Sequence, residues 1–521
     1  MRIPSHPFSY YPNYWPSSAW DNSSASTSYP QKTSDNNIWA WNKVPSIYHT
    51  AYAMPWQNQL KDMFHKRQAV IYALNLRTFA ATDNNGNNQI DPEQNESGTF
   101  LKAIKRLPEL KAMGINTIHL LPISPVGQLG RLGKAGSPGS VYAPATLESI
   151  NPEFDELGDP RSVIEEAKAF VEACHQQGIH VMADIPSCGS IDLERARPEL
   201  FARNEKGESL TPTTWVDIRM FVKDSPELRT YYSRLFKTLA EDIGVDGFRV
   251  DVARARSTEF WRHFINKYPT KAWLAESYVE EDASPMKNIP RDIPAELLRA
   301  GFDSAYGQFH IFHSMGSQEY NNYLLQNRAL IKSVGTKKSF IGSFGTHDDK
   351  SLMTRGGPTF CKLATGLMMT QPDTNPYVID GFLTGYSHEF DIFNWEKPFQ
   401  GHHPDIGDFF KQMGQIRQKY QDVIGRGNYI PLHSSNPNII SFVRQLGNKS
   451  VMVIANKNVN AAEKSLIKVP KLKVTQKLDN LAPEYGDKST FIVDNGQIYT
   501  YPIAPGRFYM FEVDLPPMPA Y

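Results

Sequence analysis

Short apolar runs alternate with longer amphipathic stretches from residue 69 to residue 381. Such runs predict strands, and strands that alternate with helices favour a parallel sheet covered by helices. One helix candidate, 160–177, places its apolar residues on a single helical face. Eight strand candidates with insertions fit a (β/α)8 TIM barrel better than an open sheet. The runs are 69–76, 115–123, 179–186, 248–253, 272–277, 302–307, 339–345 and 376–381.

Both ends of the chain depart from this rhythm. Residues 1–65 are rich in Ser, Pro, Tyr, Asn and Trp without a clear period, which predicts a partly disordered N-terminal extension. Residues 428–521 hold short strand-like segments separated by turn residues, which predicts an all-β sandwich. We therefore expect the barrel to occupy residues 66–427, with a short inserted subdomain at about 188–225.

Charge and composition exclude several classes of partner. Lys plus Arg number 55 and Asp plus Glu number 55, so the formal net charge is zero. A nucleic-acid-binding protein usually carries a basic excess, so we expect no nucleic-acid partner. The sequence shows no apolar run of membrane-spanning length and no signal-peptide pattern, so we expect no membrane association and a cytoplasmic location. Three cysteines exclude a disulfide-dense scaffold.

Ionisable residues stand where four of the predicted strands end. The carboxyl-terminal ends of barrel strands are where the active sites of this fold are built. One such residue would be weak evidence, but four strands with the same placement are stronger. Ion pairs that only stabilise the barrel rim are the alternative. The residues are Asp184, Arg249 with Asp251, Glu276, and His347 with Asp348.

The available side chains suit the cleavage of an acetal. The sequence has no G-x-S-x-G nucleophile pattern, no phosphate-binding loop and no evident Cys/His metal spacing. Two carboxylates can split a glycosidic bond when one attacks carbon and the other protonates the leaving oxygen. Arg249 precedes Asp251 by two positions, so both project from one strand face, and we expect Arg249 to lower the pKa of Asp251. Glu276 is flanked by apolar residues, a setting that raises a carboxyl pKa and suits a general acid.

From about residue 70 to about residue 515 the sequence resembles the α-amylase superfamily, glycoside hydrolase family 13. Three short motifs carry the resemblance, and they occur in the family's order. The resemblance implies a retaining enzyme that cleaves α-glucosidic bonds in an α-glucan or α-glucoside through a covalent glycosyl-enzyme, without an organic cofactor. The motifs are GFRVDVARA at 247–255, WLAES at 273–277 and FGTHDD at 344–349.

The resemblance implies a role for each polar residue of these motifs. Asp251 would be the nucleophile, with Arg249 as its partner. Glu276 would be the acid/base. Asp348 would stabilise the transition state through sugar hydroxyls, and His347 would bind the same ring.

Two other segments match the family in part. DIPSCG retains Asp184, expected to serve substrate binding, but Cys188 and Gly189 stand where the family has Asn-His. That His normally contacts the sugar at the cleaved bond. Its absence argues against ordinary amylase activity. SVYAPATLESINPEF places Tyr142 where an aromatic ring stacks on the sugar, and a packed loop tyrosine is the alternative.

The loop DNNGNNQID at 83–91 carries oxygen side chains at alternate positions, as a hard cation such as Ca²⁺ requires. The same spacing resembles the calcium loop of oligo-1,6-glucosidase-like members of the family, which implies a structural Ca²⁺. A plain Asn/Gly loop is the alternative. The candidate ligands are Asp83, Asn85, Asn87, Asp91 and the backbone carbonyl of Gln89.

Three functions stay open at this point. The first is a hydrolase, and the second is a transglycosidase or maltosyltransferase on the same barrel. Members that transfer maltosyl units also lack the Asn-His pattern and resemble this chain at 197–201, but they lack the His-Asp pair that it keeps. The third is a non-catalytic glycan-binding protein, against which the three carboxylates argue.

Overall fold

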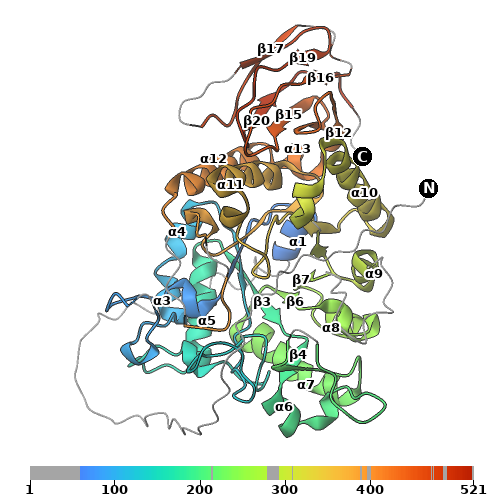
Figure 1. Ribbon diagram of the computed structural model, residues 1–521. Coiled ribbons are helices and arrows are strands. Elements are labelled where there is room, and N and C mark those ends of the chain that lie inside the picture. The colour runs from blue at the N-terminus through green and yellow to red at the C-terminus, as the bar shows by residue number, and fades with distance from the viewer. Residues whose placement is uncertain are drawn as a thin grey trace, which may run out of the picture. The chain divides into compact units, whose positions relative to one another are not determined.

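The computed structural model describes residues 59–518, apart from 88, 213–214, 278–292, 308, 388–389, 396–400, 471, 473–474 and 485–489. Within these residues the chain forms a barrel of strands and helices followed by a region of antiparallel sheets (Figure 1). Residues 1–58 of the predicted extension lie outside the described part. Its last residues belong to helix α1 (Gln59–Lys66), which buries Leu60 and Phe64 among residues of the barrel strands.

The barrel is the predicted (β/α)8 fold, and all eight strand predictions correspond to strands. All neighbouring barrel strands that pair within the described residues are parallel. The strands are β1 (Ile71–Leu74), β2 (Thr117–Leu120), β3 (His180–Ile185), β6 (Gly247–Val250), β7 (Ala272–Ala275), β8 (Ser304–Tyr306), β9 (Ser339–Ile341), β10 (Thr374–Asn375) and β11 (Tyr377–Ile379).

The barrel closes through a divided last strand. β10 pairs with β9, whereas β11 pairs with β1 at the other end of the sheet. Only Pro376 separates β10 from β11, and proline has no backbone N–H to donate to a ladder. Its carbonyl still accepts the N–H of Ile71 at 2.9 Å. Residues 374–379 therefore pair with β9 on one side and with β1 on the other, which closes the barrel.

Helices cover the outside of this barrel, as the alternating pattern predicts (Figure 1). Helix α5 shows how the sequence sets a boundary, because Ser162 and Glu165 form a reciprocal capping box at its start. The barrel helices are α2 (Leu76–Phe79), α3 (Phe100–Ile104), α4 (Leu107–Ala112), α5 (Val163–Gln176), α7 (Pro226–Lys237), α8 (Thr258–Lys267), α9 (Ile293–Ala300), α10 (Ser317–Val334), α11 (Leu352–Thr370), α12 (Pro404–Lys419) and α13 (Gln421–Arg426). None of the described helices is long and apolar enough to cross a membrane.

A small structure stands between β3 and β6, where the short insertion is expected. Strand β4 (Cys188–Ser190) pairs antiparallel with β5 (Ile218–Met220), and helix α6 (Ile191–Ala196) follows β4 directly. Because β4 begins three residues after β3 ends, this hairpin-like pair sits at the rim where the predicted site residues stand.

The C-terminal strands form sheets with a hydrophobic core of their own. A four-stranded antiparallel sheet has the order β12-β14-β15-β20, and a three-stranded sheet has the order β13-β16-β19. The strands are β12 (Asn428–Pro431), β13 (His433–Ser434), β14 (Ile439–Leu446), β15 (Lys449–Asn456), β16 (Leu466–Lys468), β17 (Gln476–Asp479), β18 (Thr490–Val493), β19 (Gln497–Tyr499) and β20 (Phe508–Glu512).

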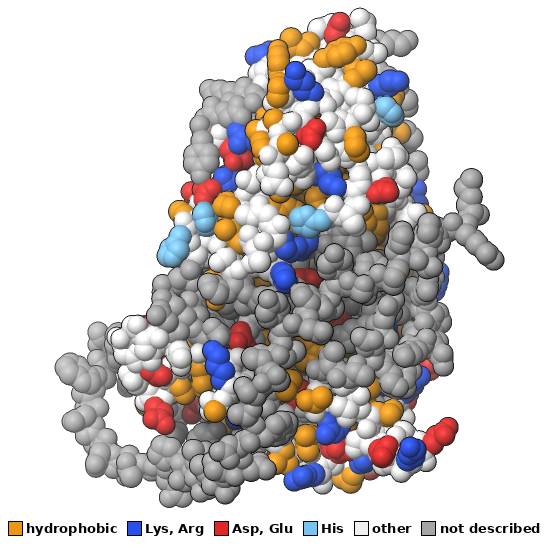
Figure 2. All heavy atoms as spheres, viewed as in Figure 1, with side chains coloured by type: hydrophobic (Ala, Val, Ile, Leu, Met, Phe, Trp, Pro, Cys, Tyr) orange, Lys and Arg blue, Asp and Glu red, His pale blue; other side chains and the backbone are white. Residues whose placement is uncertain are grey.

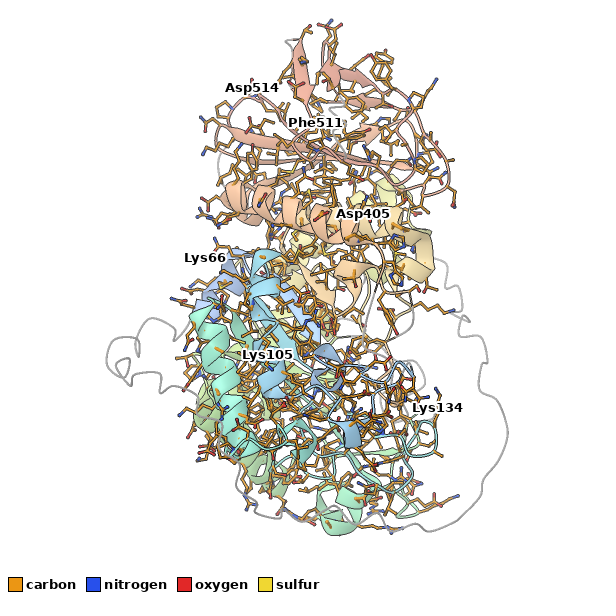
Figure 3. All side chains as sticks on the ribbon, turned by 90° about the vertical axis from the view of Figure 1, so that its left-hand side faces the viewer. Lys66, Lys105, Lys134, Asp405, Phe511 and Asp514 are labelled. Carbon is orange, nitrogen blue, oxygen red and sulfur yellow. The ribbon has the colours of Figure 1, made fainter. Side chains whose placement is uncertain are left out.

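Close packing and ion pairs join these sheets to the barrel helices. A Cβ at Gly366 of α11 would lie 2.4 Å from the ring of Phe508, so only glycine admits this contact. Lys362 of α11 lies 2.7 Å from Asp405 of α12 and 3.0 Å from Glu484 of the C-terminal region. Figure 3 shows Asp405 on the helices next to the sheets and Phe511 within the sheets.

Charged side chains on the visible face do not segregate by sign. Figure 2 shows Lys and Arg interspersed with Asp and Glu over the described part of that face. On the described part of this face, positive and negative side chains are therefore mixed and do not form one basic and one acidic patch.

Candidate active site

Arg249 lies at the centre of a cluster of buried charges. Its Nη1 lies 2.9 Å from Oδ2 of Asp184 and 3.0 Å from Oδ1 of Asp251. Its Nη2 lies 2.8 Å from Oε1 of Glu276, and its Nε donates to the hydroxyl of Tyr306 at 3.1 Å. The side chain is 0% exposed, so a single desolvated guanidinium holds three carboxylates together.

The register of three neighbouring strands sets this arrangement. Asp184 on β3 is the direct partner of Arg249 on β6, so the two side chains lie side by side. The N–H of Asp251 bonds to the carbonyl of Ile185 at 3.0 Å, and the N–H of Glu276 bonds to that of Val250 at 3.0 Å. The two carboxylates therefore stand just past the strand ends, on backbone that the ladder still fixes.

Asp184 carries a stable negative charge. Burial raises the pKa of this carboxyl, but Arg249 and the ring of His119 overcome that effect and hold the pKa below its usual value. Asp184 is therefore ionised at neutral pH and acts as the permanent counter-charge of Arg249.

The net pKa of Asp251 is raised, although Arg249 lowers it as expected. Burial and the adjacent Glu276 raise the pKa of Asp251 well above the usual range, and the opposing effect of Arg249 is smaller. The two-residue spacing of Arg249 and Asp251 reveals the cation but not the second carboxylate, which comes from another strand. A negative charge on one carboxyl group opposes ionisation of its neighbour, so Asp251 takes up a proton more readily than a free carboxyl group does.

Tyr142, His347 and Asp348 form an adjoining wall. The rings of Tyr142 and His347 stack with centroids 5.3 Å apart and an interplanar angle of 7°. The Tyr142 hydroxyl donates to Oδ2 of Asp184 at 2.9 Å, which links this wall to the Arg249 cluster. His347 Nε2 lies 3.5 Å from Oδ1 of Asp348, whose side chain is 42% exposed. The structure thus brings all seven predicted catalytic and substrate-binding residues into one connected group.

The two outer residues differ in charge and in access to solvent. Burial lowers the pKa of His347 to about 4, so the ring is neutral at pH 7, and its buried Nδ1 meets no partner among the described residues. Burial raises the pKa of Asp348, while its exposed fraction moderates that effect. A neutral imidazole and an accessible carboxylate are both suited to hydroxyl groups of an uncharged ligand.

Three buried residues of the cluster were not found from the sequence. His119 on β2 is 0% exposed, and its Nε2 lies 3.1 Å from Oδ2 of Asp184. Its Nδ1 lies 3.0 Å from the hydroxyl of Tyr377 on β11. Tyr306 on β8 is uncharged, and its hydroxyl accepts a hydrogen bond from Nε of Arg249. The available signal was one ionisable residue, His119, inside an otherwise apolar predicted strand.

The residue after Asp251 has an unusual backbone. Val252 lies in the left-handed region at φ 37° and ψ 56°, which is rare for a β-branched residue and costs about 1–3 kcal/mol. In this conformation its N–H donates to Oε2 of Glu276 at 2.7 Å. The strained turn therefore gives the second carboxylate a fixed donor.

Packing fills the positions where Asn-His is expected. Cys188 is a small core residue, buried in a cluster with Met220 and Ala255. A Cβ at Gly189 would lie 2.8 Å from both Leu193 and Phe201, so the hairpin leaves no room for a side chain. The sugar contact that His makes elsewhere is therefore not supplied from position 189.

The chain was compared with known proteins. No protein-family model matches it. It is 21% identical over 469 residues to a cyclomaltodextrinase of Thermoanaerobacter pseudethanolicus, which covers 82% of this chain and 75% of that protein. It is 24% identical over 461 residues to neopullulanase 2 of Thermoactinomyces vulgaris, covering 78% and 72% respectively.

Solved structures agree with the fold. A maltogenic α-amylase from Thermotoga neapolitana superposes with a TM-score of 0.68 at 21% identity, over 87% of this chain and 100% of that one. An α-amylase from Geobacillus thermoleovorans, complexed with acarbose, gives 0.67 at 17% identity, over 86% and 98%. The sequence relatives and the fold thus support the resemblance to the α-amylase superfamily. The relatives named cyclomaltodextrinase and neopullulanase favour an enzyme.

The contact of His119 with Asp184 can be tested by mutation. We predict that His119→Phe lowers kcat/KM for an α-glucoside about 10–100-fold, because loss of a supporting contact loosens a functional carboxylate. Tyr377→Phe removes the hydrogen bonds of the outer hydroxyl to His119 and Tyr306 but leaves the contact between His119 and Asp184, so it should cost less. Steady-state kinetics and melting curves measure both variants. A folded His119→Phe protein with unchanged kcat/KM would show that Arg249 and Tyr142 position Asp184 without His119.

Proposed function

We propose that the protein is a retaining enzyme that cleaves α-glucosidic bonds in an α-glucan or α-glucoside. The observation that carries the proposal is the contact of Asp251 and Glu276 with neighbouring nitrogens of one guanidinium, at 3.0 and 2.8 Å. Retaining pairs lie about 5–5.5 Å apart, whereas inverting pairs leave room for a water between them. Two carboxylates on one guanidinium fit the closer arrangement.

In a retaining mechanism the two carboxyl groups divide the labour. Asp251 attacks the anomeric carbon as a carboxylate while Glu276 gives its proton to the leaving oxygen, and the glycosidic bond breaks. The product is a glycosyl ester on Asp251. Glu276, now ionised, then accepts a proton from water or from a sugar hydroxyl, and that oxygen displaces Asp251 from the anomeric carbon. The pair ends with the one proton with which it began.

The surrounding residues serve the sugar at the cleaved bond. Asp348 and neutral His347 are placed to bind its hydroxyl groups, and the Tyr142 ring, stacked on His347, completes the same wall. Arg249 and Asp184 hold the catalytic pair from below. The relatives named cyclomaltodextrinase and neopullulanase support an α-glucan or a maltodextrin as the substrate class.

Transfer to a sugar acceptor is the second candidate function. The observation that favours it is the packing of Leu193 and Phe201 against Gly189. This packing replaces a sugar contact that ordinary amylases have and that maltosyl-transferring members also lack. Product analysis of maltooligosaccharides with and without added acceptor sugar separates the two. Lengthened products would support transfer, and shortened products alone would support hydrolysis.

The division of labour predicts a difference between two variants. Glu276→Gln should lower kcat on maltooligosaccharides about 10²–10⁴-fold, because it removes general acid catalysis. The same variant should be far less impaired in the bond-breaking step with α-glucosyl fluoride, since fluoride leaves without a proton. Asp251→Asn should be inactive on both substrates, because the nucleophile serves both reactions.

The matched control for these variants is Asp408→Asn, which alters an exposed carboxylate on α12. It should keep wild-type rates on both substrates. Equal losses of Glu276→Gln on the fluoride and the oligosaccharide in the bond-breaking step would contradict the acid role. Activity in Asp251→Asn would contradict the nucleophile.

We also propose that the loop 83–91 binds a structural Ca²⁺. Its donors are oxygen atoms of the kind that Ca²⁺ takes. The side-chain amides of Asn85 and Asn87 converge on Oδ2 of Asp91, at 2.5 and 2.9 Å. Glu96 closes the loop by accepting the N–H groups of Asn84 and Asp91. To bind the ion, Asn85 and Asn87 would turn their amide oxygens toward the place now occupied by these N–H groups, with Asp83, Gln89 and Asp91 as the other ligands.

The calcium proposal predicts a specific effect on stability. Adding Ca²⁺ to chelator-treated protein should raise Tm, because a ligand that binds only the folded state stabilises it. Asp91→Asn should abolish the rise by removing the carboxylate on which the loop converges. Glu93→Gln alters an exposed neighbour and should preserve it. A Tm that does not respond to Ca²⁺ would indicate a plain Asn/Gly loop.

A further inference from the structure

A second cluster of titratable side chains lies at the opposite end of the barrel from the active site. His175 stands in the last turn of α5, and His180 is the first residue of β3. Asp246 immediately precedes β6, which begins at Gly247. All three thus lie at the amino-terminal side of the strands, whereas Asp251 and Glu276 lie past the carboxyl-terminal ends.

The three side chains converge on one oxygen atom. His175 Nε2 lies 2.8 Å from Oδ2 of Asp246, and His180 Nδ1 lies 3.5 Å from the same oxygen. One ligand atom from each residue lies within 4.8 Å of the other two. Among the described residues, this is the one group of three or more His, Cys, Asp or Glu side chains with such spacing.

These separations match the coordination sphere of a small transition-metal ion. Ligand atoms at about 2.0–2.1 Å from a tetrahedral Zn²⁺ are about 3.3 Å from each other. The 2.8 and 3.5 Å distances bracket that value, so shifts of a few tenths of an ångström would admit the ion. Imidazole nitrogens are borderline-soft donors, and a carboxylate oxygen is a hard donor. Because Ca²⁺ takes oxygen ligands, a set of two imidazoles and one carboxylate suits Zn²⁺ better.

The surroundings of the cluster are ordered and open on one side. Asp246 Oδ2 also accepts the N–H of Val181 at 2.8 Å, which fixes the carboxylate against β3. The ammonium of Lys271, a nearby cation, is directed to the carbonyl of Val245 at 2.7 Å. His180 is 3% exposed, but His175 is 24% exposed. An ion therefore reaches the cluster from the His175 side, where water can complete its coordination.

We propose that His175, His180 and Asp246 form a binding site for one Zn²⁺-like transition-metal ion at the amino-terminal end of the barrel. The ion takes the place of the hydrogen between His175 Nε2 and Asp246 Oδ2, and that proton leaves to solvent. Bound there, it links the end of α5 to the beginnings of β3 and β6. Residues at this end of a barrel serve stability rather than chemistry, so the site is structural.

Binding to tag-free, full-length protein tests the proposal. After removal of metals by a chelator, titration calorimetry with ZnCl₂ should show one tight equivalent. His175→Gln should weaken that binding at least about tenfold, because even supporting residues of metal sites contribute 10–100-fold. His433→Gln changes an exposed histidine of the C-terminal sheets and should leave binding unchanged.

A spectroscopic measurement keeps the proposal testable if His175→Gln fails to fold. Wild-type protein loaded with one equivalent of Co²⁺ should show the intense visible absorption of four-coordinate cobalt, and Zn²⁺ should abolish it. Only the weak spectrum of hydrated Co²⁺, no tight Zn²⁺ equivalent, or equal Zn²⁺ affinity in folded His175→Gln would overturn the proposal.

Discussion

The burial of one guanidinium constrains the rest of the active site. Arg249 is fully desolvated, and a buried charge without partners is strongly unfavourable. Its partners are therefore obligatory: removing one member of a buried pair typically costs about 3–5 kcal/mol. Asp184 supplies the permanent counter-charge, and the catalytic carboxylates supply the rest. Stability and chemistry consequently depend on the same contacts.

The barrel makes this arrangement possible because three neighbouring parallel strands end at one rim. Asp184 and Arg249 are register partners, so a slip of one residue would turn one of them out of the cluster. Backbone hydrogen bonds continue past the strand ends to Asp251 and Glu276. The strained turn at Val252 then adds a donor to Glu276. The backbone thus fixes the positions of Asp251 and Glu276, whereas burial and the neighbouring carboxylate raise the pKa of Asp251.

The sequence allowed the barrel and the main site residues to be predicted, because both follow from local patterns. The eight apolar runs identify the strands, and the two-residue spacing of Arg249 and Asp251 predicts a shared face. Long-range packing was not predictable in this way. The raised pKa of Asp251 depends on Glu276 from another strand, and the support from His119 depends on Tyr377 far along the chain. The closed space at Gly189 depends on how Phe201 folds back against β4.

The central claim is that Asp251 and Glu276 act as a retaining pair through a covalent glycosyl-enzyme. The most direct test is the anomeric configuration of the first product, followed by proton NMR during cleavage of an α-glucosidic substrate before mutarotation. Two successive displacements at the anomeric carbon predict that the α-anomer is released first. Initial release of the β-anomer would mean a single displacement by water and would contradict the account.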